Sequence, residues 1–292
     1  MCGCGLLNLN KPQGWTSRQA VDRVKKLVRP AKTGHAGTLD PLATGVLVIG
    51  IGAATRLIQY VQRMPKSYTA TFLLGRTSDT EDTDGQVVEL DHPPQPTQAQ
   101  IRAAAAKLLG TIRQRPPAFS ALKVHGQRAY KLARKGMAVE LAPREVDIYR
   151  LDVLDYDYPR LTLRVDCGSG TYVRSLGRDL AESLGTGGVM CSLVRTAIGS
   201  FRVEEAIEPD QLSVENLPQL LAPPLVAVDW LPRVELSPDE VAATRQGKTL
   251  VRDFPAGEQR NEWAAIDPQG QLVALLARLE PGLLRPTCVL PE

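Results

Sequence analysis

A polar segment rich in glycine and threonine, residues 32–44, leads directly into a short apolar run, and this junction constrains the fold more than any other feature of the sequence. The run Gly45–Ile51 has valine or isoleucine at four of its seven positions. Apolar runs of this length with β-branched residues are typical of strands buried on both faces. We therefore predict that the polar segment is a loop anchored in the core, where functional side chains often gather.

Further strands and helices alternate along the chain without the even spacing of repeated β-α-β units. Strands are predicted at residues 5–10, 66–75, 86–90 and 161–167. Helices are predicted from a cap at Thr16 or Ser17 to Val28, from a capping box at Thr97–Gln100 through Leu109 with a stop at Gly110, and at residues 173–184. The prediction is an α+β fold with a mixed, largely antiparallel sheet.

Prolines cluster between residues 222 and 232, which predicts a boundary there. Beyond it, Ser237–Glu240 is typical of a capped helix start, and residues 263–266 and 272–277 are typical of short strands. We predict a large domain at residues 1–230 and a small β-rich C-terminal domain at residues 231–292.

Charge is unevenly distributed along the chain, although the net charge is only +3. Nine basic and no acidic residues lie between Ile101 and Lys135, and an acidic stretch at residues 79–91 precedes them. Segregated charge of this kind suits either a phosphate-binding surface or a solvated face.

Composition excludes several classes of protein. Hydrophobic residues make up 43% and charged residues 23%, as in ordinary globular proteins, and no run is long and apolar enough for a membrane span. With no signal peptide in evidence, the predicted location is the cytoplasm. The five scattered cysteines lack paired zinc-ligand spacing, so we predict reduced thiols and no metal.

Two polar clusters could carry chemistry. Gly34–Pro41 combines glycines with His35 and Asp40, while Gly168–Arg174 places Tyr172 and Arg174 where a strand passes into a helix. Each also fits a structural turn or a helix start. No nucleotide-binding glycine motif or nucleophile elbow follows a strand, which argues against a nucleotide-dependent enzyme.

Six motifs together resemble one family. They are KPQGWTS at residues 11–17, GHAGTLDPLATG at 34–45, KSY at 66–68, PPAFSALKVHGQRAY at 116–130, GTYVR at 170–174 and LVRT at 193–196. In this order, over about the first 200 residues, they resemble the TruB family of tRNA pseudouridine synthases. The resemblance implies the family's catalytic domain with a basic RNA-gripping insertion near residues 76–145, followed by a PUA-like RNA-binding domain.

The resemblance implies an enzyme, an isomerase that converts uridine 55 in the T-loop of tRNA to pseudouridine by base flipping, without a cofactor. The family's essential aspartate falls on Asp40, the arginine that pairs with it on Arg174, and two active-site tyrosines on Tyr68 and Tyr172, of which Tyr68 stacks on the base. The predicted substrate contacts are Leu193 as an apolar wall, His35 in the space that the base vacates, and Lys11, Lys123, Arg128 and Lys131 as RNA-binding cations.

The implied partner is tRNA, through its T-stem and T-loop, with no membrane and no obligatory protein partner, and we expect a monomer. One carboxylate could attack C1′ of the ribose, attack the base or remove a sugar proton, so the step that Asp40 performs stays open. Two alternatives also stay open: a non-catalytic tRNA-binding or folding protein on the same scaffold, and an RNA-guided synthase subunit acting on ribosomal RNA.

Overall fold

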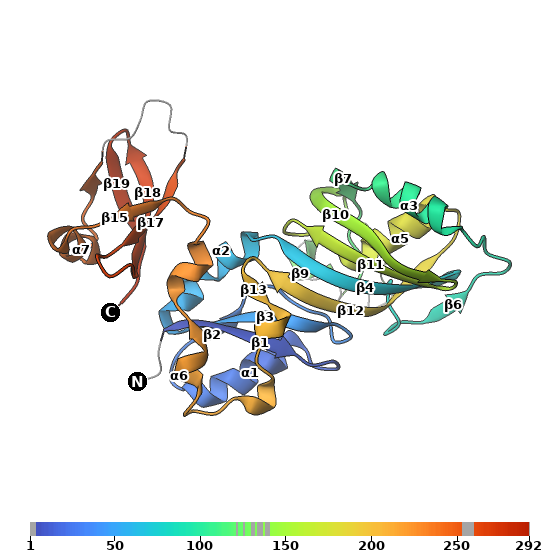
Figure 1. Cartoon of the computed structure of the whole chain (residues 1–292), viewed down its shortest axis with the longest axis horizontal. Helices are drawn as coiled ribbons and strands as arrows, with labels where there is room; N and C mark the ends of the chain where they lie inside the picture. Colours follow the sequence, from blue (N-terminus) through green and yellow to red (C-terminus); the bar gives the residue numbers. More distant parts are fainter. Residues whose placement is uncertain are drawn as a thin grey trace.

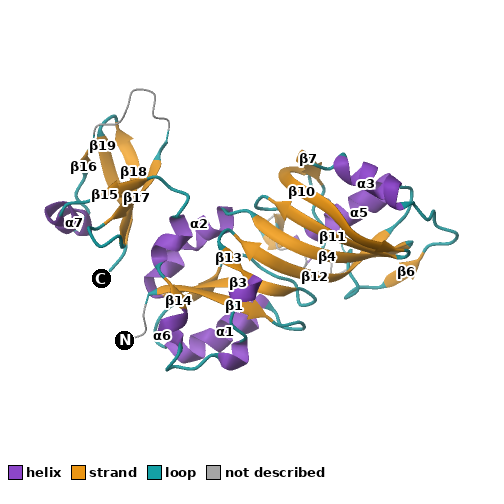
Figure 2. Cartoon of the chain, in the orientation of Figure 1, coloured by secondary structure: helices purple, strands orange, loops and turns teal. Residues whose placement is uncertain are grey.

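The structure is a computed structural model that describes residues 4–120, 122–124, 126–129, 132, 137, 141–252 and 260–291. Within these ranges, a ten-stranded sheet runs through the body and a five-stranded sheet forms a C-terminal module (Figure 1). Helices pack on both halves of the large sheet (Figure 2).

The large sheet runs, in spatial order, through β14 (Leu221–Ala222), β1 (Gly5–Lys11), β3 (Thr44–Ile51), β12 (Gly188–Ile198), β4 (Lys66–Leu74), β11 (Arg160–Cys167), β10 (Arg144–Asp157) and β7 (Gly110–Gln114). Beside this path, β2 (Thr33–His35) pairs with β3, and β13 (Phe201–Arg202) pairs with β12. The C-terminal sheet has the order β15 (Arg233–Glu235), β17 (Glu262–Ile266), β18 (Leu272–Glu280), β19 (Leu283–Val289) and β16 (Leu250–Val251). Two hairpins are β5 (Arg76–Ser78) with β6 (Val87–Glu89), and β8 (Lys123–Val124) with β9 (Gln127–Arg128).

The α-helices are α1 (Ser17–Val28), α2 (Ile58–Arg63), α3 (Gln98–Ala106), α5 (Val173–Ser183), α6 (Leu217–Leu220) and α7 (Pro238–Arg245). The 3₁₀ turns are η1 (Gly52–Leu57), η2 (Val203–Glu205), η3 (Pro209–Gln211) and η4 (Pro224–Val228). Among the described strands of the large sheet, β3 and β12 run parallel and the other pairs are antiparallel. The predicted α+β fold with a largely antiparallel sheet is confirmed.

Helix α1 covers one half of the large sheet. It begins with a capping box, in which the Thr16 hydroxyl accepts from the Gln19 backbone amide and the Gln19 side-chain oxygen accepts from the Thr16 backbone amide. Its buried face belongs to the same core cluster as Leu47 and Ile49 of β3. This packing fixes the strand into which the glycine-rich loop leads.

Helix α5 covers the other half of the sheet and carries Arg174 in its first turn. Gly177 permits its close approach, because a Cβ at this position would lie 1.9 Å from the Phe72 ring on β4. Leu176 and Leu180 of α5 are fully buried in the same core cluster as Phe72. The glycine thus sets how closely the helix lies on the sheet.

Some elements differ from the predictions. The segment predicted as a loop at residues 32–44 contains strand β2, which pairs with β3 from Thr33 opposite Ile51 to His35 opposite Ile49. Helix α3 ends at Ala106, earlier than predicted, and Gly110 takes a φ of +85° and starts strand β7. Strands β10 and β12 were not predicted at all.

The C-terminal module contacts the body through α2. Glu262 of β17 accepts hydrogen bonds from Tyr60 and Arg63, each at 2.9 Å, and Leu275 of β18 belongs to the same core cluster as Leu57. Its PUA-like character and the boundary at residue 230 stay predictions. Among the described residues, no helix has both the length and the apolarity to cross a membrane.

Candidate active site

Asp40 lies in the loop between β2 and β3, and a buried lysine holds this loop in place. The Lys11 ammonium donates to the carbonyls of Pro12 at 2.8 Å, Trp15 at 2.6 Å and Pro41 at 3.5 Å. The side chain therefore ties the end of β1 to the residue that follows Asp40.

This position corrects our expectation for Lys11. The residue is 0% exposed, and burial lowers the pKa of its ammonium to about 8, with the Asp40 charge opposing the shift. A buried ammonium that donates to backbone carbonyls anchors a loop, so the placement does not support a direct RNA contact. The motif that contains Lys11 was recognised from the sequence. The burial of Lys11, however, depends on the loop around Pro41, which is distant in the sequence.

A second anchor comes from the first residue of α1. The Ser17 hydroxyl donates to the Leu39 carbonyl at 3.0 Å and accepts from the Leu39 amide at 2.8 Å. Gly14 adds a backbone bond to the Pro41 carbonyl at 2.8 Å. The residues on either side of Asp40 are therefore fixed, which limits where its carboxylate can lie.

The Asp40 carboxylate meets Arg174 at the start of α5. Arg174 Nη2 lies 3.1 Å from Asp40 Oδ2, and Nη1 lies 3.2 Å from Asp82 Oδ2. The guanidinium also donates to the carbonyls of Thr80 at 2.6 Å and Phe119 at 3.2 Å. With carboxylates on two sides and carbonyls completing the shell, its planar fork is held in one orientation.

Asp40 is the accessible member of this group. Its side chain is 37% exposed, against 7% for Arg174 and 5% for Asp82. Asp82 is itself fixed, since its Oδ1 accepts from the Thr80 hydroxyl at 2.5 Å and the Asp84 amide at 3.2 Å. The arrangement presents one carboxylate to a ligand while a second, buried carboxylate balances the arginine.

A second buried arginine, Arg195 of β12, supports the opposite side of the loop. It is 2% exposed and donates to the carbonyls of Val46 at 2.7 Å and Gly37 at 3.1 Å. Gly45, with a φ of +97°, lies beside it in the parallel β3–β12 register, and a Cβ there would come within 2.3 Å of the Arg195 carbonyl oxygen. Only a glycine fits at this contact without displacement.

A cavity of about 340 Å³ opens at this point. Asp40, Tyr68, Tyr172, Arg174 and Leu193, all predicted site residues, line it. It is at the small end of the range for ligand pockets, which suits a group the size of one nucleotide. The structure thus brings together residues that come from four separate motifs of the sequence.

The two tyrosines are held differently. Tyr68 is buried, which raises the pKa of its hydroxyl, while a hydrogen bond from Arg195 acts in the opposite direction. Tyr172 is fixed through its backbone: its amide donates to Gln114 at 2.8 Å, and Gln114 donates to its carbonyl at 3.0 Å. The Arg144 guanidinium lies 5.0 Å from the centre of the Tyr172 ring, within range of a cation–π contact.

The remaining predicted substrate contacts are not among the described residues that line the cavity. His35 is half-buried on β2, immediately before the cavity-lining Ala36, and burial lowers the pKa of its imidazole. Its insertion into a vacated base position stays a prediction. For Lys123 and Arg128 the side chains, and for Lys131 the whole residue, lie outside the described residues.

Three residues at the site had no role assigned from sequence. Asp82 belongs to a stretch that stood out only as acidic, while Lys66 and Arg195 fall within recognised motifs. Lys66 lines the cavity and donates to the carbonyls of Gln62 and Met64, the latter at 2.7 Å, and burial lowers the pKa of its ammonium to about 8. A backbone carbonyl partner leaves no signal in the sequence, so the contacts of Lys66 and Arg195 could be found only from the structure.

Metal binding has no candidate in the part of the chain that is described, where no group of three histidine, cysteine, aspartate or glutamate side chains could hold an ion.

Comparison with known proteins shows the family to which the chain is similar. Residues 25–173 match the family model described as TruB family pseudouridylate synthase, N-terminal domain, and residues 231–291 match that of tRNA pseudouridine synthase II, C-terminal. The tRNA pseudouridine synthase B of Arthrobacter sp. (strain FB24) is 44% identical, covering 94% of this chain and 92% of the relative. That of Thermobifida fusca (strain YX) is 40% identical, covering 98% of each chain.

Solved structures with the same fold include a chain of an H/ACA RNP bound to a substrate RNA containing 2′-deoxyuridine, with a TM-score of 0.77 and 25% identity, covering 99% of this chain and 85% of that chain. A chain of a Cbf5–Nop10–Gar1 complex has a TM-score of 0.72 and 28% identity, covering 95% and 79%. Fold and site together define an enzyme of the pseudouridine synthase class, an isomerase. The chain belongs to the TruB family of pseudouridylate synthases.

Proposed function

We propose that this enzyme isomerises uridine 55 in the T-loop of tRNA to pseudouridine, acting alone and without a cofactor. The observation that carries the proposal is the accessible Asp40 carboxylate, 3.1 Å from Arg174, at the wall of a nucleotide-sized cavity. The relatives named tRNA pseudouridine synthase B match over nearly the whole chain, which supports tRNA as the substrate.

The site suits cleavage of a glycosidic bond. Breaking this bond develops positive charge at C1′, which an anionic group can stabilise or trap covalently, and Asp40 is the carboxylate that the cavity exposes. Attack on the base and removal of a sugar proton are further routes open to the same group. Arg174 orients the carboxylate in each case.

The uridine must leave its stack to reach the cavity. The Tyr68 ring and Leu193 line the cavity and supply flat and apolar surfaces for the extruded base. Burial raises the pKa of the Tyr68 hydroxyl, so the cavity disfavours ionisation of this ring. Tyr172, which also lines the cavity, would bound the ribose side, and His35 would occupy the space that the base leaves.

Incubation of the purified protein with an unmodified tRNA transcript, followed by mass-spectrometric mapping, tests the proposal. We expect a single pseudouridine at position 55, and none in a control transcript with cytidine there. No product would support the non-catalytic alternative. Product only after a guide RNA and partner proteins are added would support the guided alternative, to which the H/ACA neighbours give some weight.

The basic segment supplies a separate test of RNA binding. We propose that Lys123, Arg128 and Lys131 contact phosphates, because they lie in a stretch without acidic residues. Replacing all three by glutamine should reduce the slope of log K against log salt by about 2 units, since each phosphate contact contributes roughly 0.7–0.9. Filter binding over a salt series measures the slope, and an unchanged slope would rule out these contacts.

A further inference from the structure

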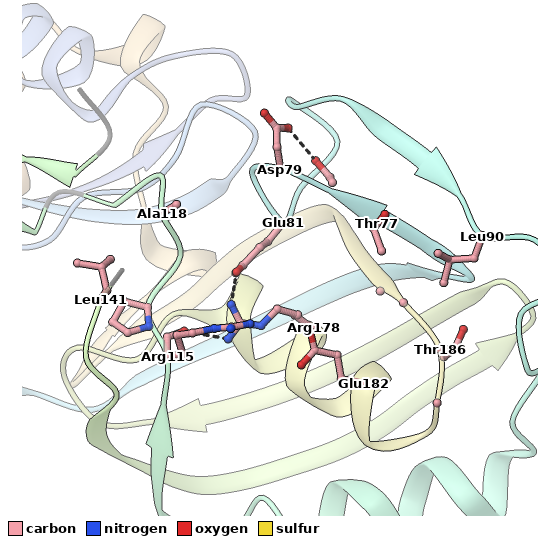
Figure 3. A pocket seen from close by; sticks show the side chains of 15 residues that line it. Thr77, Asp79, Glu81, Leu90, Arg115, Ala118, Leu141, Arg178, Glu182 and Thr186 are labelled. Carbon is pink, nitrogen blue, oxygen red and sulfur yellow. Dashed lines mark hydrogen bonds and ion pairs between the residues drawn. The ribbon is translucent and has the colours of Figure 1, made fainter. Parts of the chain in front are cut away.

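Helix α5 carries a second arginine one turn after Arg174. Arg178 occupies position i+4, which places both side chains on the same face of the helix. Its guanidinium forms an ion pair with Glu81, another with Asp179 at 2.7 Å, and a hydrogen bond to the Arg115 carbonyl at 2.8 Å. Figure 3 shows Glu81 and Arg178 meeting above α5 with Arg115 beside them, at the edge of a hollow of about 710 Å³.

Two of the partners of Arg178, Glu81 and Arg115, belong to the two segments that supply carbonyls to Arg174, while Asp179 lies on α5 itself. Thr80, whose carbonyl accepts from Arg174 at 2.6 Å, directly precedes Glu81. Phe119, whose carbonyl accepts at 3.2 Å, lies four residues after Arg115. The Arg178 guanidinium therefore anchors both backbone segments whose carbonyls bind the Arg174 guanidinium.

Glu81 has a backbone conformation that needs support. Its φ of +64° lies in the left-handed region, which is uncommon for a residue with a side chain. Two groups of α5 hold its carboxylate: Arg178, and the Ser175 hydroxyl, which donates at 2.7 Å. Its carbonyl also accepts from the Met190 amide of β12 at 3.0 Å. This turn is what directs the Thr80 carbonyl and the Asp82 carboxylate toward Arg174.

The pair is shielded from water, with both side chains 12% exposed. In such surroundings, loss of Arg178 leaves the Glu81 carboxylate with Ser175 alone, and loss of the Glu81 charge releases the ion pair that ties the backbone carrying Glu81 to α5. For Glu81 this backbone is the turn between Thr80 and Asp82, so a shift would reach Arg174 and then Asp40.

We propose that Glu81 and Arg178 are positioning residues: their ion pair fixes the 80–82 turn and the 115–119 segment, and so sets the orientation of Arg174 and the Asp40 carboxylate. This inference rests on the proposed function. Neither residue touches the cavity that would hold the uridine, so their effect passes through Arg174.

Single-turnover isomerisation at saturating tRNA tests the proposal, with tRNA affinity and melting temperature measured on the same samples. Glu81→Gln keeps the shape and an acceptor for Ser175 but removes the charge. We expect its rate to fall about tenfold to a hundredfold, as for a small misplacement of a catalytic group, while tRNA affinity changes little. Arg178→Lys keeps a charge but cannot reach both Glu81 and the Arg115 carbonyl, and we expect a smaller loss of rate.

Asp179→Asn is the matched control, because it removes the other carboxylate partner of Arg178 without touching the 80–82 turn. We expect its rate to equal that of the wild type. In an Arg174→Lys background, Glu81→Gln should add little further loss, since no arginine remains to be oriented.

Three outcomes would overturn the inference while leaving the proposed function standing: an active wild type with an equally active Glu81→Gln variant, equal losses in Glu81→Gln and Asp179→Asn, or losses that multiply in the Arg174→Lys background. A fall in melting temperature without a fall in rate per folded molecule would assign the pair a merely structural role. An inactive wild type would instead overturn the proposed function, and the inference with it.

Discussion

The buried cations in and around the Asp40 cavity fall into two groups that are held in different ways. In one group, Lys11, Lys66 and Arg195, here called the carbonyl-bound cations, donate to backbone carbonyls. In the other, Arg174 and Arg178, here called the carboxylate-bound arginines, form ion pairs with acidic side chains. The first group binds backbone carbonyls alone, whereas the second also pairs with carboxylates and, through Arg174, orients the Asp40 side chain.

Asp40 and its neighbours are held by members of both groups. Its neighbours Leu39 and Pro41 are tied down by Ser17 and by Lys11, while its carboxylate is oriented by Arg174. The difference has an electrostatic consequence as well. A carbonyl does not neutralise a cation, and burial accordingly lowers the pKa of both Lys11 and Lys66 to about 8.

The largest effect is expected at the shared residue. Asp40→Asn keeps the shape of the side chain and its backbone anchors, but removes the charge that pairs with Arg174. If the carboxylate does the chemistry, the single-turnover rate should fall on the order of 10⁴-fold or more, as when an enzyme loses its nucleophile. Filter binding should show tRNA affinity within a few-fold of the wild type. Measurable turnover by the variant would remove Asp40 from the reaction.

The next largest effect is expected on stability, at the backbone contact between Gly45 and Arg195. Gly45→Ala would place a Cβ 2.3 Å from the Arg195 carbonyl oxygen at a φ of +97°. Overpacking and left-handed strain together should lower the free energy of unfolding by about 3–5 kcal/mol, measured by urea denaturation.

Gly14→Ala is the matched control for this change, because Gly14 also has a positive φ, +80°, but nothing lies within 4 Å of its added Cβ. Only the conformational cost of about 1–2 kcal/mol should appear there. Equal losses at the two positions would show that the contact with Arg195 does not matter.

A more gradual effect is a pH dependence that separates the carbonyl-bound cations from the arginines. With a pKa of about 8 when folded and 10.5 as its ordinary value, Lys66 binds fewer protons in the folded than in the unfolded state between these pH values. Its contribution to the free energy of unfolding therefore rises with pH across this window, and its burial cost is full below pH 8.

Lys66→Met removes this contribution. The difference in unfolding free energy, wild type minus variant, should rise by up to about 1.4 kcal/mol per pH unit between pH 8 and 10.5. Parallel stability curves for the two proteins would show that Lys66 does not lose its proton in the folded state.

The sequence predicted the local elements near the site well. The Thr16 cap, the strand after the glycine-rich loop and the helix that carries Arg174 follow from side-chain periodicity and capping residues. Asp40 and Arg174 were paired only through the family resemblance, and the structure places them 3.1 Å apart.

Long-range contacts account for what was missed. Asp82 stands among other acidic residues in the sequence, and its ion pair with Arg174 forms only because the 80–82 turn lies beside α5. Lys11 was expected from the resemblance to bind RNA, but it is buried beneath the loop around Pro41. Strand β10 has an irregular burial pattern and register shifts against β11, so it lacks the clean alternation that identifies a strand.

Parallel measurement of Arg174→Lys and Arg195→Lys tests most directly whether the two groups of cations do different work. For each, the single-turnover rate at saturating tRNA is compared with the free energy of unfolding. Arg174→Lys should lose about 10²–10³-fold in rate, because a point charge cannot orient Asp40 as the fork does, together with about 1–3 kcal/mol of stability for a Thr80 or Phe119 carbonyl left without its donor. Arg195→Lys should lose about 1–3 kcal/mol of stability for a carbonyl left without its donor, with a far smaller change in rate. A loss of rate in Arg195→Lys as large as that in Arg174→Lys, at unchanged stability, would contradict the account.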